Sequence, residues 1–207
     1  MAKEKVNNQN LSFNDVFSSS GLPEKLGFTV LMLAIYRLGV HIPLYGVDQD
    51  ALKSNPALSS GLMGLVDMFA GGALSALSIF ALGIGPYITA SIIMQLLVEV
   101  IPPLKDMQRN HGEEGRKQYQ QISRFATLGL AVVQSFALAR FLDVAKIAIN
   151  PGFNFYLTTV LVLTISALLV MWIGEIITEK GVGNGASLLI FIGIASKLPI
   201  MISDTAT

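Results

Sequence analysis

The sequence predicts an all-α integral membrane protein with five transmembrane helices and a short re-entrant half-helix. Of the 207 residues, 52% are hydrophobic and only 14% are charged, whereas soluble domains carry about 25% charged residues. The mean hydropathy is +0.60. The apolar residues also gather in long runs, and roughly 20 such residues are what a helix needs to cross a bilayer core about 30 Å thick.

Five segments have about the length and composition of a membrane span. They run over about Leu26–Leu44, Gly71–Leu97, Phe125–Leu142, Phe153–Gly174 and Gly185–Ile202. Residues 1–25 are polar and lack the apolar core of a secretory signal, so we expect them to be retained as a cytoplasmic segment. Residues 102–124 are expected to form a polar cytoplasmic loop, and residues 203–207 to follow the last span on the external side.

The second span contains unusual residues for a helix. Between Asp67 and Glu99 lie 31 uncharged residues, which as one helix would reach about 47 Å and exceed the hydrocarbon thickness. The pair Gly71 and Gly72 is the expected break. The preceding ten residues, 60–69, span only about 15 Å, and this predicts a re-entrant half-helix that lies within protein or lines a cavity.

The basic residues favour a cytoplasmic N-terminus, because Lys and Arg gather on the cytoplasmic side of membrane helices. Nine of the fourteen fall on that side when the five spans are threaded from inside to outside. They are Lys3, Lys5, Lys25, Lys105, Arg109, Arg116, Lys117, Arg124 and Lys180.

An isoleucine stripe marks the second span. Ile84, Ile88 and Ile92 recur every four residues and therefore share one helix face. Such a stripe ordinarily faces lipid or packs against a neighbouring helix. The alternative is a dry constriction in which aliphatic side chains close a pore by excluding water. Gly83, Gly85 and Pro86 fit either reading, because small residues allow close packing and proline kinks a helix.

The remaining polar groups have ordinary explanations as well as functional ones. Arg37 and His41 share a face near the outer end of the first span, where Arg37 can pair with a helix-end carbonyl or a carboxylate, or snorkel outward. Glu175 and Glu179 lie at a helix end at the interface, the usual place for carboxylates. In "GVGNGAS" the glycines are expected to end the fourth span, with Asn184 as the N-cap of the fifth.

The sequence offers little for catalysis or metal binding. It has no cysteine and two histidines, and its net charge is formally zero, so we expect no enzyme activity, no cofactor, no metal site and no direct DNA binding. His111 with Glu113 and Glu114 could hold a metal, but one histidine in an acidic loop is weak evidence for a site, and a solvated cytoplasmic loop that contacts a partner is favoured. A secondary transporter, suggested by the broken helix, is the alternative from another class; a membrane enzyme using Glu175, Glu179 and Arg37 is the third.

Four stretches together closely resemble the SecY family, the central subunit of the bacterial protein-conducting channel. They are "RLGVHIPLYGVD", "MFAGGALSALSIFALGIGPYITASIIMQLL", "NPGFNFYLTTV" and "MWIGEIITEKGVGNGASLLIF". The family has ten membrane helices in two halves of five, and this chain is similar to the first half, with Thr207 near the hinge between the halves.

The resemblance also implies roles for particular residues. Those that match the pore ring are Ile84, Ile88, Ala186 and Ile190, and those that match the lateral gate are Thr89, Ile92 and Ile93. Ala186 departs from the bulky aliphatic residue usual at its ring position. Those that match the plug are Ser60, Gly61, Leu62, Met63, Gly64, Leu65, Val66, Asp67, Met68, Phe69, Ala70, Gly71 and Gly72.

The function implied is passive conduction of unfolded secretory polypeptides, with lateral release of apolar segments into the membrane. The implied partners are the second half of SecY, SecE, SecG, SecA or the ribosome, signal sequences, nascent polypeptides and membrane lipid. The implied location is the bacterial inner membrane or a thylakoid membrane. We expect no sealed channel from this half alone.

Overall fold

The computed structural model describes residues 21–53, 67, 70–110 and 112–205. Seven helices are assigned in this part of the chain, and it contains no β-strand beyond two isolated bridges, Pro43 with Ser78 and Val47 with Ala148. The helices are α2 (Leu22–Val40), α3 (Gln49–Lys53), α5 (Gly85–Val100), α6 (Pro102–Asn110), α7 (Gly112–Val144), α8 (Phe153–Lys180) and α9 (Gly185–Thr205).

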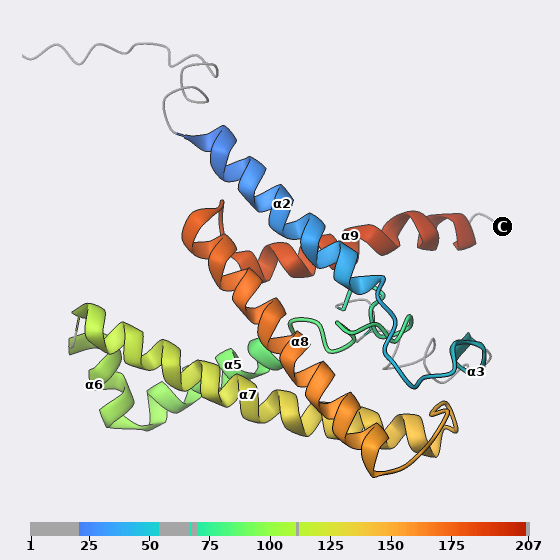
Figure 1. Cartoon of the computed structure of the whole chain (residues 1–207). Coiled ribbons are helices and arrows are strands. Elements are labelled where there is room, and N and C mark those ends of the chain that lie inside the picture. The colour runs from blue at the N-terminus through green and yellow to red at the C-terminus, as the bar shows by residue number, and fades with distance from the viewer. Residues whose placement is uncertain (1–20, 54–66, 68–69, 111, 206–207) are drawn as a thin grey trace, which may run out of the picture.

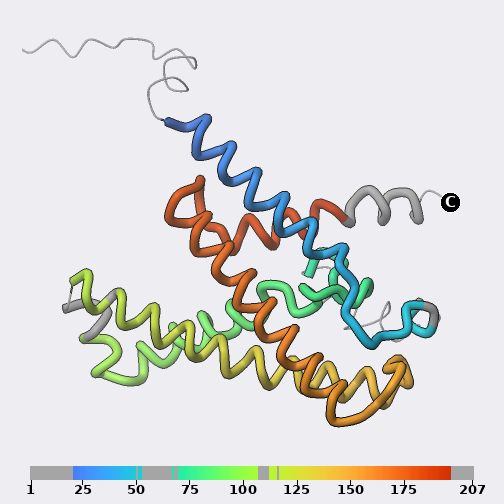
Figure 2. Tube along the Cα trace, in the orientation of Figure 1, coloured from blue at the N-terminus to red at the C-terminus, as the bar shows by residue number. Residues whose placement is uncertain are grey.

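Helices α7 and α8 form the main pair of the fold. They have 33 and 28 residues, and α8 returns across α7 after a short connection (Figure 1). Helix α5 packs on α7, whereas α2 and α9 pack on α8. The trace in Figure 2 shows that α2 leads into the connection before α5. Helix α5 contacts α8 as well as α7. The described chain is therefore all-helical, as predicted.

Two helices, α7 and α8, are long and apolar enough to cross a membrane. The apolar stretches 85–100 and 185–196 are shorter. Helix α2 begins at Leu22, with Pro23 in its first turn, and ends at Val40 rather than at the predicted Leu44. The all-helical architecture agrees with the sequence, whereas the exact number of five spans stays a prediction.

The predicted second span is wrong in its first half. Residues 70–84 form a series of turns, which we call the turn segment, and helix begins only at Gly85. Three glycines of the segment, Gly71, Gly72 and Gly83, have φ of 68°, 87° and 53°, and Leu77 has φ of 38°. These left-handed conformations interrupt a helix, and Pro86 then favours a helix start because it stands in the first turn.

The predicted polar loop over residues 102–124 is also corrected. Its first part is helix α6, and from Gly112 onward it belongs to α7, which runs without interruption into the apolar stretch. Hydropathy identifies only the part of a helix that is apolar, so a polar extension outside the membrane reads as a loop. The polar residues therefore form a helical hairpin, seen at one side of Figure 1.

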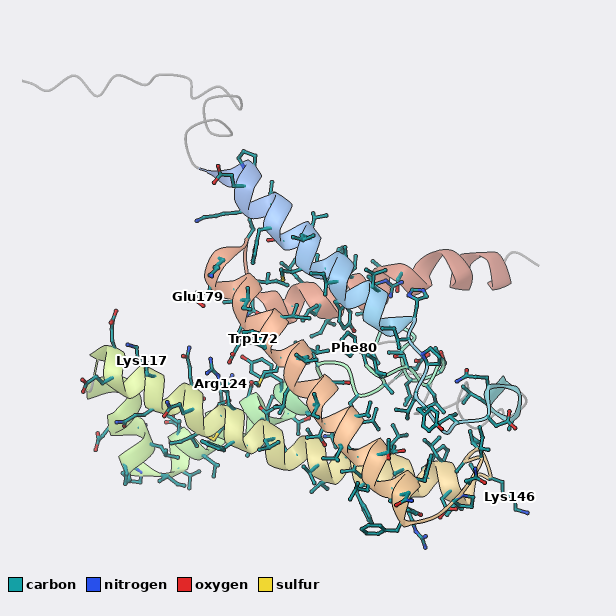
Figure 3. The ribbon with its side chains drawn as sticks, in the orientation of Figure 1. Phe80, Lys117, Arg124, Lys146, Trp172 and Glu179 are labelled. Atoms are coloured by element: carbon teal, nitrogen blue, oxygen red, sulfur yellow. The ribbon has the colours of Figure 1, made fainter. Side chains whose placement is uncertain are left out.

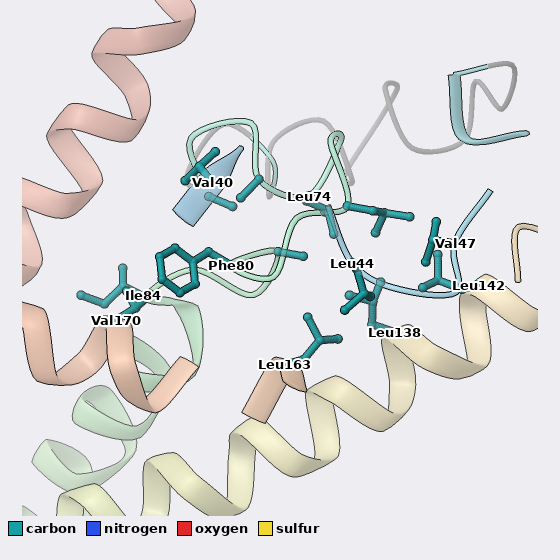
Figure 4. Packing of buried hydrophobic residues seen from close by; sticks show 14 of the residues in the cluster. Val40, Leu44, Val47, Leu74, Phe80, Ile84, Leu138, Leu142, Leu163 and Val170 are labelled. Atoms are coloured by element: carbon teal, nitrogen blue, oxygen red, sulfur yellow. The ribbon is translucent and has the colours of Figure 1, made fainter. Parts of the chain in front are cut away.

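One apolar cluster joins the helices to the turn segment (Figure 4). Its buried members come from α2, the turn segment, α7, α8, α9 and the loops between them. They include Tyr36, Val40, Leu44, Val47, Leu74, Leu77, Phe80, Ile84, Leu138, Leu142, Ile147, Leu163, Val170, Ile177 and Leu189. The turn segment is therefore part of the core and not a surface loop.

The α8–α9 connection has the expected caps. Gly181 follows the last residue of α8 and donates its N–H to the Ile177 carbonyl at 2.8 Å. The Asn184 side chain accepts the N–H of Ser187 at 3.1 Å, which is the N-cap geometry predicted for that residue. The Thr29 hydroxyl of α2 accepts the N–H of Val182 at 3.1 Å. This connection is therefore fixed at both helix ends and against α2.

Candidate functional site

The isoleucine stripe begins where helix α5 begins. Ile84 stands at the N-cap with φ −88° and ψ 0°, and its carbonyl accepts the N–H of Ile88 at 3.1 Å. The Ile84 side chain is only 4% exposed, whereas Ile88 is half-buried. Ile84 is therefore a packed core residue in this chain, and Ile88 is the more accessible of the two predicted ring residues on α5.

Gly174 of α8 brings the predicted ring residues of two helices to one place. A Cβ at Gly174 would lie 3.4 Å from Ile84 Cδ1, 3.4 Å from Leu189 Cδ1 and 3.7 Å from the backbone nitrogen of Ala186. The structure thus places Ile84 and Ala186 close to the same glycine. Leu189, which the sequence analysis did not single out, is buried at this junction.

Helices α8 and α9 approach most closely at this junction. A Cβ at Gly185 would overlap the carbonyl of Gly174, so the first residue of α9 has room for a glycine only. The Gly185 N–H donates to the Thr178 hydroxyl at 2.8 Å. Small residues at a helix crossing let two backbones approach, and here they set the position of Ala186.

A polar cavity of about 690 Å³ opens next to the junction. Gly174 and Ala186 line it where it meets the apolar core, and α5, α7, α8 and the start of α9 supply its polar wall. The lining side chains are those of Tyr87, Ser91, Gln95, Tyr119, Gln120, Ser123, Arg124, Glu175, Thr178, Glu179, Asn184 and Ala186. Burial, with a smaller contribution from nearby Tyr87, raises the pKa of the Tyr119 hydroxyl, which therefore stays protonated at neutral pH.

Two charged groups of this cavity, Arg124 and Glu175, are paired across α7 and α8. The guanidinium of Arg124 contacts both carboxylate oxygens of Glu175, at 3.1 and 2.8 Å. Figure 3 shows Arg124 on α7 and Glu179 near the end of α8. Glu175 is thus engaged in a bidentate ion pair between helices, and this is the ordinary structural role that the sequence analysis allowed for a carboxylate at a helix end.

A second cavity, of about 550 Å³, lies at the opposite end of the turn segment. It is lined by the end of α2, the turn at residues 71–76, and Ser196 of α9. Arg37, His41 and Gln49 contribute polar side chains to it. The Arg37 Nη1 donates to the Gly71 carbonyl at 3.2 Å, so Arg37 pairs with a carbonyl, one of the partners expected for it.

An apolar region separates the two cavities. Ala186 lines the first and Ser196 the second, and ten helical residues correspond to about 15 Å along α9. Between these two positions, α9 carries Leu189, half-buried Ile190 and Gly193. The buried side chains next to this apolar region are those of Ile84 and Phe80. The chain therefore presents a polar cavity, an apolar region and a second cavity with a mixed polar and apolar lining.

The predicted gate and plug residues are only partly visible. Thr89 is half-buried and donates its hydroxyl to the Gly85 carbonyl at 3.0 Å, whereas Ile92 and Ile93 are 53% and 39% exposed. Of the predicted plug, Asp67 and residues 70–72 are described, and the other positions lie outside the described residues. Asp67 is buried and its carboxylate accepts the N–H of Ser75 at 2.7 Å.

Metal chemistry finds no support in the described part of the chain. No group of three His, Cys, Asp or Glu side chains there could hold a metal ion. The candidate ligand His111 lies outside the described residues.

The two long apolar helices have the length and composition of membrane helices, and sequence relatives specify the family. The SecY protein-family profile matches residues 78–207. Protein translocase subunit SecY of Synechococcus elongatus is 44% identical over 99% of this chain and 47% of its own length. SecY of Pseudomonas aeruginosa is 43% identical over 91% of this chain and 43% of its own length. The chain belongs to the SecY family and spans about half the length of these relatives.

Solved structures show the same fold. A structure described as that of a protein-conducting channel matches with a TM-score of 0.62 at 20% identity, over 85% of this chain and 37% of that one. Sec61 in the canine ribosome-channel complex from the endoplasmic reticulum gives the same values. A third match, with a TM-score of 0.60 and 20% identity over 86% of this chain and 36% of that one, is to a study of the SecY plug domain in the closed translocation channel.

Proposed function

We propose that this chain forms one half of a protein-conducting channel that passes unfolded secretory polypeptides and releases apolar segments sideways into lipid. The observation that carries the proposal is the succession of a polar cavity, an apolar region at Ile84 and Ala186, and a second cavity with a mixed lining that includes Arg37 and His41. An aliphatic constriction excludes water and ions while offering a passing chain no group to bind. A solute transporter would instead need ligands for its solute at this level.

In this proposal Ile84, Ile88, Ala186 and Ile190 contribute to the pore ring. The half-buried state of Ile88, Ala186 and Ile190 supports positions at the edge of the chain, where a second half would complete a ring. Ile84 is already buried. It would support the position of Ala186, because both residues lie close to Gly174. Because Ala186 is small, its neighbour Leu189 supplies the bulk at that point of the wall.

The lateral gate is proposed along α5. Ile92 and Ile93 expose large apolar surfaces, as expected of side chains that meet lipid or an apolar segment leaving the channel. Thr89 lies on the preceding turn. Residues 60–72 are proposed as the plug, anchored at their C-terminal end by the turn that contains Gly71 and Gly72.

The polar cavity is proposed to face the cytoplasm, with five spans and a cytoplasmic N-terminus. The α6–α7 hairpin carries Lys105 and Lys117 beside it, in agreement with the positive-inside tendency. The proposed partners are the second half of the channel, SecE, SecG, SecA or a ribosome, and signal sequences. The proposed location is the bacterial inner membrane or a thylakoid membrane, and the channel itself carries out no chemical step.

The test uses the absence of cysteine from the chain. Single cysteines are placed at Ile88, Ala186 and, as a control on α8, at Leu169, which is exposed and lines a separate apolar groove. The full-length channel with its companion subunits is engaged by a stalled secretory chain that carries one cysteine. Disulfides at Ile88 and Ala186 but not at Leu169 are expected. Equal cross-linking at all three positions, in an assembled channel, would reject the proposal.

A further inference from the structure

Arg37 places a cation inside the membrane domain. Its side chain is half-buried in the second cavity, and Nη1 donates to the Gly71 carbonyl at 3.2 Å. The ion pairs found among the described residues join Lys105 to Glu99, Arg124 to Glu175 and Arg140 to Asp143, so none involves Arg37. The partner seen here for this partly buried charge is a backbone carbonyl.

The residue before Arg37 holds the adjacent carbonyl. The Tyr36 hydroxyl donates to the Ala70 carbonyl at 3.5 Å, and its ring stacks on Phe80 with centroids 5.8 Å apart and planes 9° apart. Consecutive side chains of α2 therefore reach consecutive carbonyls of one turn. Tyr36 is almost fully buried, whereas Arg37 borders the cavity, so Arg37 is the accessible member of the pair.

The same turn is pressed against α9 on its other side. Gly71 has φ of +68°, and a Cβ there would lie 2.8 Å from the Cα of Gly193. A side chain does not fit in this gap without displacement of the backbone. The turn at residues 70–72 is thus wedged between α2 and the helix that carries Ala186 and Ile190.

Internal bonds keep this turn in one piece. The Gly72 N–H donates to the Asp67 carbonyl at 2.9 Å, and the Asp67 carboxylate accepts the N–H of Ser75. The Ser75 hydroxyl donates to the Gly72 carbonyl at 3.1 Å. Because these bonds lie within the turn, movement of the turn relative to α2 requires the loss of the Arg37 bond and of the longer Tyr36 bond, but not of these.

We propose that Arg37 is a positioning residue that fastens the turn at residues 70–72 to α2 and holds the closed arrangement of the channel until a passing polypeptide takes over its bond. The proposal rests on the proposed function. A guanidinium carries several N–H donors, and Arg37 borders an open cavity. The carbonyl of a polypeptide in that cavity can therefore replace the Gly71 carbonyl, and the exchange of one such bond for another costs little.

The test compares variants of the full-length channel with its companion subunits in sealed vesicles. Arg37→Gln removes the charge and weakens the bond, Arg37→Lys keeps a cationic donor, and Arg140→Gln removes an arginine elsewhere. Resting ion permeability and transport of a secretory protein with an intact signal sequence are both measured. Loss of a charge-assisted hydrogen bond from the closed state is expected to raise resting permeability about tenfold in Arg37→Gln. Arg37→Lys should stay near the wild type, and Arg140→Gln should match it.

A second variant probes the same turn without changing a charge. Gly71→Ala crowds the turn against Gly193 and is expected to raise resting permeability as Arg37→Gln does. If Arg37→Gln fails to accumulate in the membrane, Gly71→Ala decides between the outcomes. Unchanged permeability in assembled variants that still transport would overturn the role of Arg37, whereas a wild-type channel that transports nothing would overturn the proposed function itself.

Discussion

The α7–α8 pair and the turn segment at residues 70–84 solve the same problem in opposite ways. Inside a membrane every backbone N–H and carbonyl needs a partner. Helices α7 and α8 satisfy theirs internally. Side chains link the two helices at the Arg124–Glu175 ion pair and at the Tyr156 hydroxyl, which bonds to Arg140 and Asp143. The turn segment closes part of its hydrogen bonds between its own turns and takes further backbone partners from the stretch after α2.

Few hydrogen bonds join the backbone of the turn segment to other parts of the chain. The Leu77 carbonyl accepts the N–H of Leu44 at 2.8 Å, and the N–H of Ile79 donates to the Ile42 carbonyl at 2.9 Å. Phe80 packs against Gly39 and stacks on Tyr36. We expect a helix pair with many small contacts to tolerate the loss of one contact. A segment that depends on a few contacts, such as those of Phe80, should not. The difference suggests a rigid wall beside an element able to move.

The largest expected effect is at the main anchor of the turn segment. Phe80→Ala leaves a cavity against Tyr36 and Gly39 and should lower the free energy of unfolding by about 3–5 kcal/mol. The measurement is SDS-induced unfolding of the assembled channel in mixed micelles. A loss below that of Leu128→Ala, a more exposed position on α7, would contradict the importance of this anchor.

Crowding the same anchor should have a smaller effect. In Gly39→Ala the added methyl group would overlap the Phe80 ring, and overpacking of this kind costs about 1–3 kcal/mol. Gly129→Ala on α7 is the matched control, since a Cβ there meets nothing within 4 Å. The same unfolding assay should show a loss for Gly39→Ala only, and equal behaviour of the two variants would argue against tight packing at Gly39.

A single polar contact within the helix pair should matter less. The hydroxyls of Ser135 and Thr164 lie 3.2 Å apart, buried between α7 and α8. A double-mutant cycle with Ser135→Ala and Thr164→Val should give a coupling energy of about 0.6 kcal/mol, typical of hydrogen bonds between membrane helices. A coupling as large as the Phe80→Ala effect would mean that the pair also depends on one anchor.

The smallest effect is expected at the partly exposed end of the pair. The side chains of Arg124 and Glu175 are 49% and 20% exposed, and ion pairs near water contribute at most about 1 kcal/mol. Arg124→Gln should therefore change the free energy of unfolding little, and the change should shrink further in high salt. A large loss that persists in salt would place this pair in a drier setting than the structure gives it.

The same contrast explains which parts of the fold could be predicted from the sequence. The apolar stretches of α7, α8 and α9 and the cap at Asn184 follow from local composition and were identified correctly. The turn segment was read as helix, because an uncharged run rich in Ala, Leu and Ile satisfies the hydropathy of a span whatever its backbone does. Its glycines indicated a break, but a single break at Gly71 and Gly72 was expected in place of turns up to Ile84.

For the candidate site, the sequence supplied candidate residues but not their contacts, and the roles of these residues stay a prediction. The four-residue spacing identified Ile84 and Ile88, and the family resemblance added Ala186. The junction at Gly174 and the partner of Arg37 could not be found, because each depends on residues far apart in the chain and on backbone atoms that have no signature in the sequence. Arg37 and Gly71 are separated by 34 positions, and any residue type would supply the same carbonyl.

The continuous course of α7 has a mechanical consequence. Its 33 residues form a rod of about 50 Å, of which only the part from Phe125 onward is apolar, while the hairpin with α6 extends the other end beyond that level (Figure 1). A force applied to the hairpin therefore acts on one continuous helix, which packs on α8. Because the helix has no break, a displacement of the hairpin is carried along it to Asp143 near the far end.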